Sequence, residues 1–111
     1  MSTLSTHVLD AVRGVPASGI AVEAFARDAE DRWQLVGSGT TDDDGRIPRV
    51  AEAPLAPGIH RIVFATADYF AAQHVDAFYP EVAVTFTVDD ERHYHVPLLL
   101  SPFAFSTYRG S

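Results

Sequence analysis

The chain has 111 residues, which fits one domain spanning 1–111, and it lacks cysteine, which excludes disulfides and thiolate metal sites. Its formal net charge is -7, and its eight cationic residues are all arginine, so nucleic acid and anionic membrane are not expected partners. No stretch is long and apolar enough to span a membrane, and residues 1–7 lack the basic start of a secretory signal, so we expect a cytoplasmic protein.

The first half of the chain is predicted to consist of short strands and turns. Strands are expected over 4–10, 20–27 and 33–38, and the spacing of the last two indicates a hairpin. Residues 46–50 fit a short edge strand, because Pro48 cannot donate a ladder hydrogen bond. Asp42-Asp43-Asp44-Gly45 matches only part of a calcium loop, since Arg46 stands where a further ligand is needed, so we interpret it as a solvated turn that presents Arg46.

The second half of the chain contains the clearest strand. A strand is expected over 59–65, then a single helix from Ala67 to about His74 with Thr66 as its N-cap. Residues 82–88 alternate apolar and small or polar side chains, which is typical of a half-buried strand. Asp89-Asp90-Glu91 fits a charged hairpin tip.

The last nineteen residues form two strand-like runs, 93–100 and 103–111, with Ser101-Pro102 as the turn between them. Because the second run stays aromatic to the end of the chain, we expect this terminus to be packed rather than frayed. The Leu98-Leu99-Leu100 run is expected in the core and in an interface. Seven or eight short strands at regular spacing predict an all-β fold, a β-sandwich.

Two kinds of chemistry fit the residues alone. His93 and His95 lie two apart on a predicted strand, a spacing that suits zinc, but no third ligand is evident. His7 and His95 could instead act as general bases near neutral pH, with Arg46 or Arg109 stabilising the charge that develops on an attacked carbonyl. This set favours metal-free hydrolysis.

Four segments together resemble the 5-hydroxyisourate hydrolase (transthyretin-related) family over essentially the whole chain. They are Leu4-Ser5-Thr6-His7-Val8-Leu9-Asp10, Gly45-Arg46, His93-Tyr94-His95-Val96-Pro97-Leu98-Leu99-Leu100-Ser101-Pro102, and the terminal Tyr108-Arg109-Gly110-Ser111. The terminal tetrapeptide is the most specific, because transthyretin itself lacks that ending and replaces the active-site histidines.

The resemblance implies a transthyretin-like (prealbumin-like) β-sandwich of two four-stranded sheets with one short helix. It also implies a homotetramer, a dimer of dimers whose active sites are shared between subunits, and no cofactor or metal. The expected reaction is hydrolysis of 5-hydroxyisourate to 2-oxo-4-hydroxy-4-carboxy-5-ureidoimidazoline in the degradation of urate to allantoin. The resemblance places four residues in a catalytic role and three in substrate binding: catalytic His7, Arg46, His95 and Ser111; substrate-binding Tyr108, Arg109 and Gly110.

Two other functions compete with the hydrolase. A transthyretin-like carrier would hold a small molecule in the tetramer channel without turnover, and it would need no base and oxyanion donor together. A metal-binding sandwich domain would use His93 and His95, and His93 otherwise is only a residue flanking the family motif.

Overall fold

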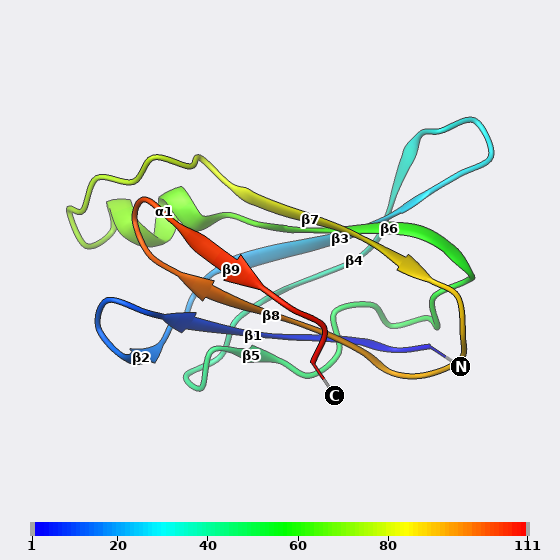
Figure 1. Ribbon diagram of the computed structural model, residues 1–111, viewed down its shortest axis with the longest axis horizontal. Helices are drawn as coiled ribbons and strands as arrows, with labels where there is room; N and C mark the ends of the chain where they lie inside the picture. Colours follow the sequence, from blue (N-terminus) through cyan, green and yellow to red (C-terminus); the bar gives the residue numbers. More distant parts are fainter. Residues whose placement is uncertain (1, 111) are drawn as a thin grey trace.

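The computed structural model describes residues 2–110, which form two β-sheets packed face to face (Figure 1). One sheet has the order β2-β1-β8-β9 with β5 also paired to β1, and the other has the order β4-β3-β6-β7. The predicted all-β sandwich with one short helix is confirmed, and the two-residue β5 makes the first sheet five-stranded. The elements are β1 (Leu4–Asp10), β2 (Val15–Pro16), β3 (Ala21–Arg27), β4 (Trp33–Thr40), β5 (Arg46–Ile47), β6 (Gly58–Phe64), α1 (Thr66–Ala71), β7 (Val82–Val88), β8 (Tyr94–Leu100) and β9 (Phe105–Thr107).

Alternate residues of the strands fill the core between the sheets. On β7, Val82 and Val88 are buried and the residues between them alternate between half-buried and exposed, which confirms the predicted half-buried strand. On β8, Leu98 and Leu100 are fully buried, as expected for that leucine run. The predicted hairpin is also present, because β3 and β4 pair antiparallel.

The pairing of β1 with β8 joins the two ends of the chain. The two strands are parallel and run in register from Leu4 opposite Tyr94 to Asp10 opposite Leu100. Figure 1 shows them side by side in the middle of their sheet, with β5 and β9 on opposite sides. Residues that the sequence separates widely therefore meet on one surface.

The helix differs from its prediction. Thr66 does not cap it: Ala65 occupies the cap position, and Thr66 is the first helical residue, its buried hydroxyl without a hydrogen-bond partner among the described residues. α1 ends at Ala71, short of the predicted His74, because His74 has a positive φ of 58° that ends a right-handed helix. Among residues 2–110, no helix is long and apolar enough to cross a membrane.

The segment between β7 and β8 also differs. The prediction of a hairpin tip at 89–91 is wrong, because β7 pairs with β6 whereas β8 pairs with β1 and β9. The segment therefore carries the chain from one sheet to the other. The Tyr94 hydroxyl donates to the Asp90 carboxylate at 3.0 Å, which ties this crossover to the start of β8.

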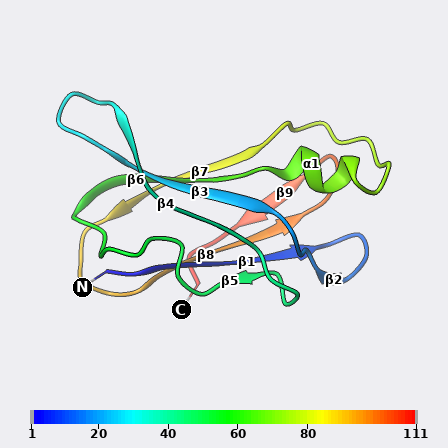
Figure 2. The ribbon, with the colours of Figure 1, turned by 180° about the vertical axis from the view of Figure 1, so that it is seen from behind.

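The two C-terminal strands pair with each other as predicted. β8 and β9 are antiparallel, and the backbone N–H of Ser101 donates to the carbonyl of Ala104 at 3.0 Å in the turn between them. All of β9 is exposed in the single chain, where it is an edge strand that pairs only with β8. The described residues of this chain therefore do not cover the terminal strand, and its packing stays a prediction. After β9 the chain stays beside β8, since Gly110 pairs antiparallel with His95 in the register of the β8–β9 pair. Figure 2 shows this sheet from the opposite side.

Candidate active site

Three strands of the five-stranded sheet bring His7, Arg46 and His95 to its outer face. His7 on β1 lies opposite Arg46 on β5, and Ser5, two residues before His7, lies opposite His95 on β8. Side chains alternate along a strand, so the neighbours of these residues point into the core. Those neighbours are buried: Leu4, Val8, Tyr94 and Val96. The two histidines are half-buried and Arg46 is exposed.

A turn with little conformational freedom presents Arg46. The Asp42 carboxylate accepts the backbone N–H groups of Asp44 at 2.9 Å and of Arg46 at 3.0 Å. Gly45 has a φ of +74°, and a Cβ on it would lie 2.4 Å from the carbonyl oxygen of Val8, so glycine is required here. Asp42 and Asp44 are exposed, which confirms the solvated turn predicted from the sequence.

His95 is held in a state suited to accept a proton. Its Nδ1 lies 2.7 Å from the Ser5 hydroxyl, which occupies that side of the ring. Burial lowers the pKa of His95, electrostatic interactions with His93, His7 and Arg46 lower it further, and a hydrogen bond with the Ser5 backbone raises it. The imidazole is therefore neutral at physiological pH and can act as a base.

His93, Ser5 on β1 and Thr3, which directly precedes β1, join this cluster. The Ser5 hydroxyl also lies 2.7 Å from His93 Nε2, and the Thr3 hydroxyl is hydrogen-bonded to His93 Nδ1. Sequence reasoning missed Ser5 and Thr3, although both share the two-residue spacing of His7, because their meeting with His93 depends on the parallel pairing of β1 with β8. In residues 2–110 no group of three or more His, Asp or Glu side chains is arranged to hold a metal ion.

Of the terminal residues, Gly110 contacts the histidine cluster. Its backbone N–H donates to the carbonyl of His95 at 2.8 Å. A Cβ on Gly110 would lie 2.4 Å from Cδ2 of the His95 ring, so the tail passes directly against the imidazole. The predicted catalytic Ser111 lies outside the described residues.

Arg109 and Tyr108 are placed differently. The Arg109 guanidinium lies over the ring of Tyr94, 4.4 Å from its centroid, and 4.0 Å from the Asp90 carboxylate. It thus faces the opening between the sheets rather than the histidines. Tyr108 is 59% exposed and lines the same opening. The structure brings together His7, Arg46, His95 and Gly110, and leaves Arg109 apart from them.

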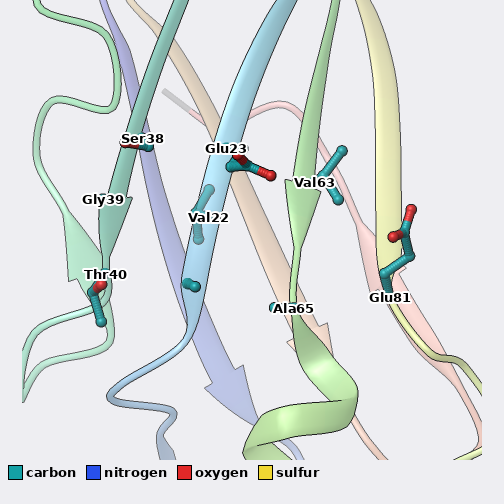
Figure 3. Close-up of a pocket in the computed structure, with 9 residues that line it drawn as sticks. Val22, Glu23, Ser38, Gly39, Thr40, Val63, Ala65 and Glu81 are labelled. Atoms are coloured by element: carbon teal, nitrogen blue, oxygen red, sulfur yellow. The ribbon is translucent and has the colours of Figure 1, made fainter. Parts of the chain in front are cut away.

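Two further hollows have different chemistry. The opening between β7 and β8 has a cavity volume of about 240 Å³ and a mostly apolar lining that includes Phe86 and Val96. The other hollow lies on the outer face of the four-stranded sheet, where Figure 3 shows Glu23 on β3 and Glu81 directly before β7. Neither of these two linings contains a histidine.

The geometry defines what this face can do. A neutral imidazole can take a proton from water, and a forked guanidinium beside it can bind a planar carbonyl group and stabilise negative charge on its oxygen. Such a pair supports hydrolysis of a small carbonyl compound.

Comparison with known proteins agrees with the fold. The model of the HIUase/Transthyretin family matches residues 4–110. The 5-hydroxyisourate hydrolase of Caulobacter vibrioides is 43% identical over 116 residues, covering all of both chains. The structure of Klebsiella pneumoniae 5-hydroxyisourate hydrolase matches with a TM-score of 0.87 at 35% identity, covering 100% of this chain and 94% of that one. Sea bream transthyretin in complex with thyroxine matches with a TM-score of 0.92 at 33% identity, covering 97% and 94%. The chain belongs to the HIUase/Transthyretin family.

Proposed function

We propose that this protein hydrolyses 5-hydroxyisourate to 2-oxo-4-hydroxy-4-carboxy-5-ureidoimidazoline, a step in urate degradation. Relatives named for this hydrolase support the reaction. Fold alone does not separate it from transthyretin, which matches equally well. The observation that carries the proposal is the meeting of a neutral imidazole, His95, with His7 and Arg46 on one face.

In the proposed mechanism a histidine activates water without a metal. The imidazole takes a proton from water while the water oxygen bonds to a carbonyl carbon of the substrate ring. The C–N bond of that amide then breaks, the ring opens, and the departing nitrogen takes the proton. We assign the proton transfer to His7 and His95 acting as a pair.

Arg46 is proposed to orient the substrate and stabilise the attacked carbonyl oxygen. Its guanidinium presents several N–H donors in a plane, which suits a flat ring rich in carbonyl groups. Its exposed position beside His7 leaves it free to meet a ligand. The structured turn before it supports this role, because it limits the directions from which Arg46 can approach.

The terminal tetrapeptide is proposed to complete the site. Gly110 lets the backbone pass close to the reacting groups, Tyr108 packs against the substrate ring, and Ser111 orients the water or a histidine. Arg109 would reach the substrate only by leaving Asp90, and at 4.0 Å with both side chains partly exposed, that ion pair is weak enough to exchange.

We further propose a homotetramer, a dimer of dimers with sites shared between subunits. The edge strands β7 and β9 present ladder groups that the described sheets leave unpaired, which favours pairing with a second copy. Large apolar side chains are also exposed near the loop after β1: Leu9, Val12 and Val15. Size-exclusion chromatography with light scattering should give the mass of four 12.1 kDa chains. A monomer mass would contradict the tetramer.

The second candidate is a carrier that binds a small molecule without turnover. The match to transthyretin solved in complex with thyroxine favours it. A carrier has no use for a base beside an oxyanion donor, so His7, Arg46 and His95 argue for the enzyme.

One experiment separates the two. Urate oxidase generates fresh 5-hydroxyisourate, and the ultraviolet band of this intermediate is followed with and without the protein. Faster decay in the presence of the protein supports the hydrolase. Decay at the spontaneous rate, with a folded protein, overturns it and favours the carrier.

A further inference from the structure

A continuous chain of hydrogen bonds leads away from the proposed base. The Ser5 hydroxyl lies 2.7 Å from Nδ1 of His95 and 2.7 Å from Nε2 of His93. Nδ1 of His93 is in turn bonded to the Thr3 hydroxyl. Ser5 is buried, with 8% of its surface exposed. Thr3 is half-buried and His93 is exposed to solvent, so the hydrogen-bonded chain runs from the buried hydroxyl toward the surface.

The chemistry of a hydroxyl limits how this chain can be ordered. Ser5 has one proton to donate, so it donates to one imidazole and accepts from the other. If it accepts from His95, then His95 carries its proton on Nδ1 and keeps a lone pair on Nε2. Ser5 then donates to His93 Nε2, and His93 donates from Nδ1 to Thr3. Each of the three bonds has one donor and one acceptor in this order.

The proposed mechanism selects this order over its reverse, which satisfies the three bonds equally well but puts the His95 proton on Nε2. Because the Ser5 hydroxyl occupies Nδ1, the nitrogen left to take a proton from water is Nε2. Nε2 has a free lone pair only when Nδ1 carries the ring proton.

We infer that Ser5 is a positioning residue that holds His95 in the Nδ1–H tautomer, and that His93 anchors the Ser5 hydroxyl in the orientation this requires. The inference rests on the proposed hydrolysis, in which His95 needs a free Nε2 lone pair to take a proton from water. It gives His93 a role that the sequence left as a flanking position. Isolated imidazole rings favour the Nε2–H tautomer, so the protein has to impose the other one.

A purely structural role explains these contacts less well. β1 and β8 already pair over seven residues each, from Leu4 opposite Tyr94 to Asp10 opposite Leu100, so the strands do not need a side-chain hydroxyl to stay together. His93 precedes β8 and is exposed, so its ring contributes little to the core. Its two side-chain hydrogen bonds are with Ser5, which contacts His95, and with Thr3.

The tautomer is measured directly, without substrate. Nitrogen-15 chemical shifts of the histidine rings, assigned through a His95→Asn variant, are recorded at pH 7.5 in the assembled protein. The expected result is a protonated Nδ1 and an unprotonated Nε2 on His95. Ser5→Ala should shift His95 toward the Nε2–H form, and Ser5→Thr, which keeps the hydroxyl, should leave it unchanged. A wild-type His95 protonated on Nε2 overturns the inference.

Kinetics supply the second readout. Ser5→Ala and His93→Phe should lower kcat by about 10- to 100-fold with little change in KM, because the wrong tautomer cannot accept the proton. Ser5→Thr and His93→Gln, which retain a bonding group at the same place, should stay within about threefold of wild type. Equal losses in the conservative variants, or none in Ser5→Ala, overturn the inference. If the wild-type protein fails to hydrolyse 5-hydroxyisourate, the proposed function fails, while the ring shifts still decide the tautomer.

Discussion

The contact between Gly110 and the His95 ring makes Gly110→Ala a sharp test of the site. The new Cβ would lie 2.4 Å from Cδ2 of His95, where ordinary contact begins at 3.4 Å, so the ring edge has to retreat by about 1 Å. Cδ2 is bonded to Nε2, so the nitrogen that takes the proton moves with it. A misplacement of about 1 Å in a reacting group can cost roughly 100-fold in rate, and we expect a loss of that order in kcat/KM.

The assay is the initial rate of 5-hydroxyisourate decay, with circular dichroism and thermal unfolding recorded on the same sample. Gly14→Ala is the matched control: Gly14 has a φ of +69° and no atom within 4 Å of the added Cβ. That control should lose about 1 kcal/mol of stability through backbone strain and keep its turnover. A folded Gly110→Ala protein with wild-type kcat/KM would refute the idea that the tail sets the position of His95.

Three other predictions follow from described contacts. Burial and electrostatic interactions with His93, His7 and Arg46 lower the pKa of His95, so kcat/KM should fall on acidification with an inflection below about 6.5. An inflection at or above that value, in a profile from pH 4 to 8, contradicts the assignment. Deleting residues 108–111 should abolish turnover and leave the circular dichroism spectrum of the sandwich intact; normal turnover would make the tail only structural. Thr41→Val should lower the free energy of unfolding in urea by about 2 kcal/mol, since the buried Thr41 hydroxyl accepts the Ile20 N–H at 2.9 Å and donates to the Ala17 carbonyl at 2.8 Å; a loss under about 0.5 kcal/mol would contradict that reasoning.

The parts of the fold predictable from the sequence are those encoded by local pattern. The alternation over 82–88 and the spacing of the hairpin between 20–27 and 33–38 correspond directly to β7 and to the β3–β4 pair. Local pattern could not identify the crossover at 89–91, because a charged turn looks the same whether the next strand joins the same sheet or the opposite one. The Thr66 cap was wrong by one residue, since Ala65 occupies the cap position and Thr66 begins the helix.

In the site, too, residues within sequence motifs were predictable, whereas residues whose role depends on tertiary pairing were not. His7, Arg46 and His95 were identified through their motifs, and the structure brings them to one face. Ser5 could not be recognised, because its importance comes from lying opposite His95 in a parallel pair formed by the two ends of the chain. The exposure of β9 was also hidden, because an apolar sequence does not reveal that its strand lies at a sheet edge.

The most direct test of the central claim compares wild type with His95→Asn in the 5-hydroxyisourate decay assay, at equal concentration and with the oligomer mass of both confirmed. Asparagine retains a polar group of similar reach but cannot take up a proton near neutral pH. We predict that wild type accelerates decay and that His95→Asn loses at least about 100-fold of that acceleration while keeping its fold and assembly. A His95→Asn protein that works near the wild-type rate would contradict the account, because the base would then lie elsewhere.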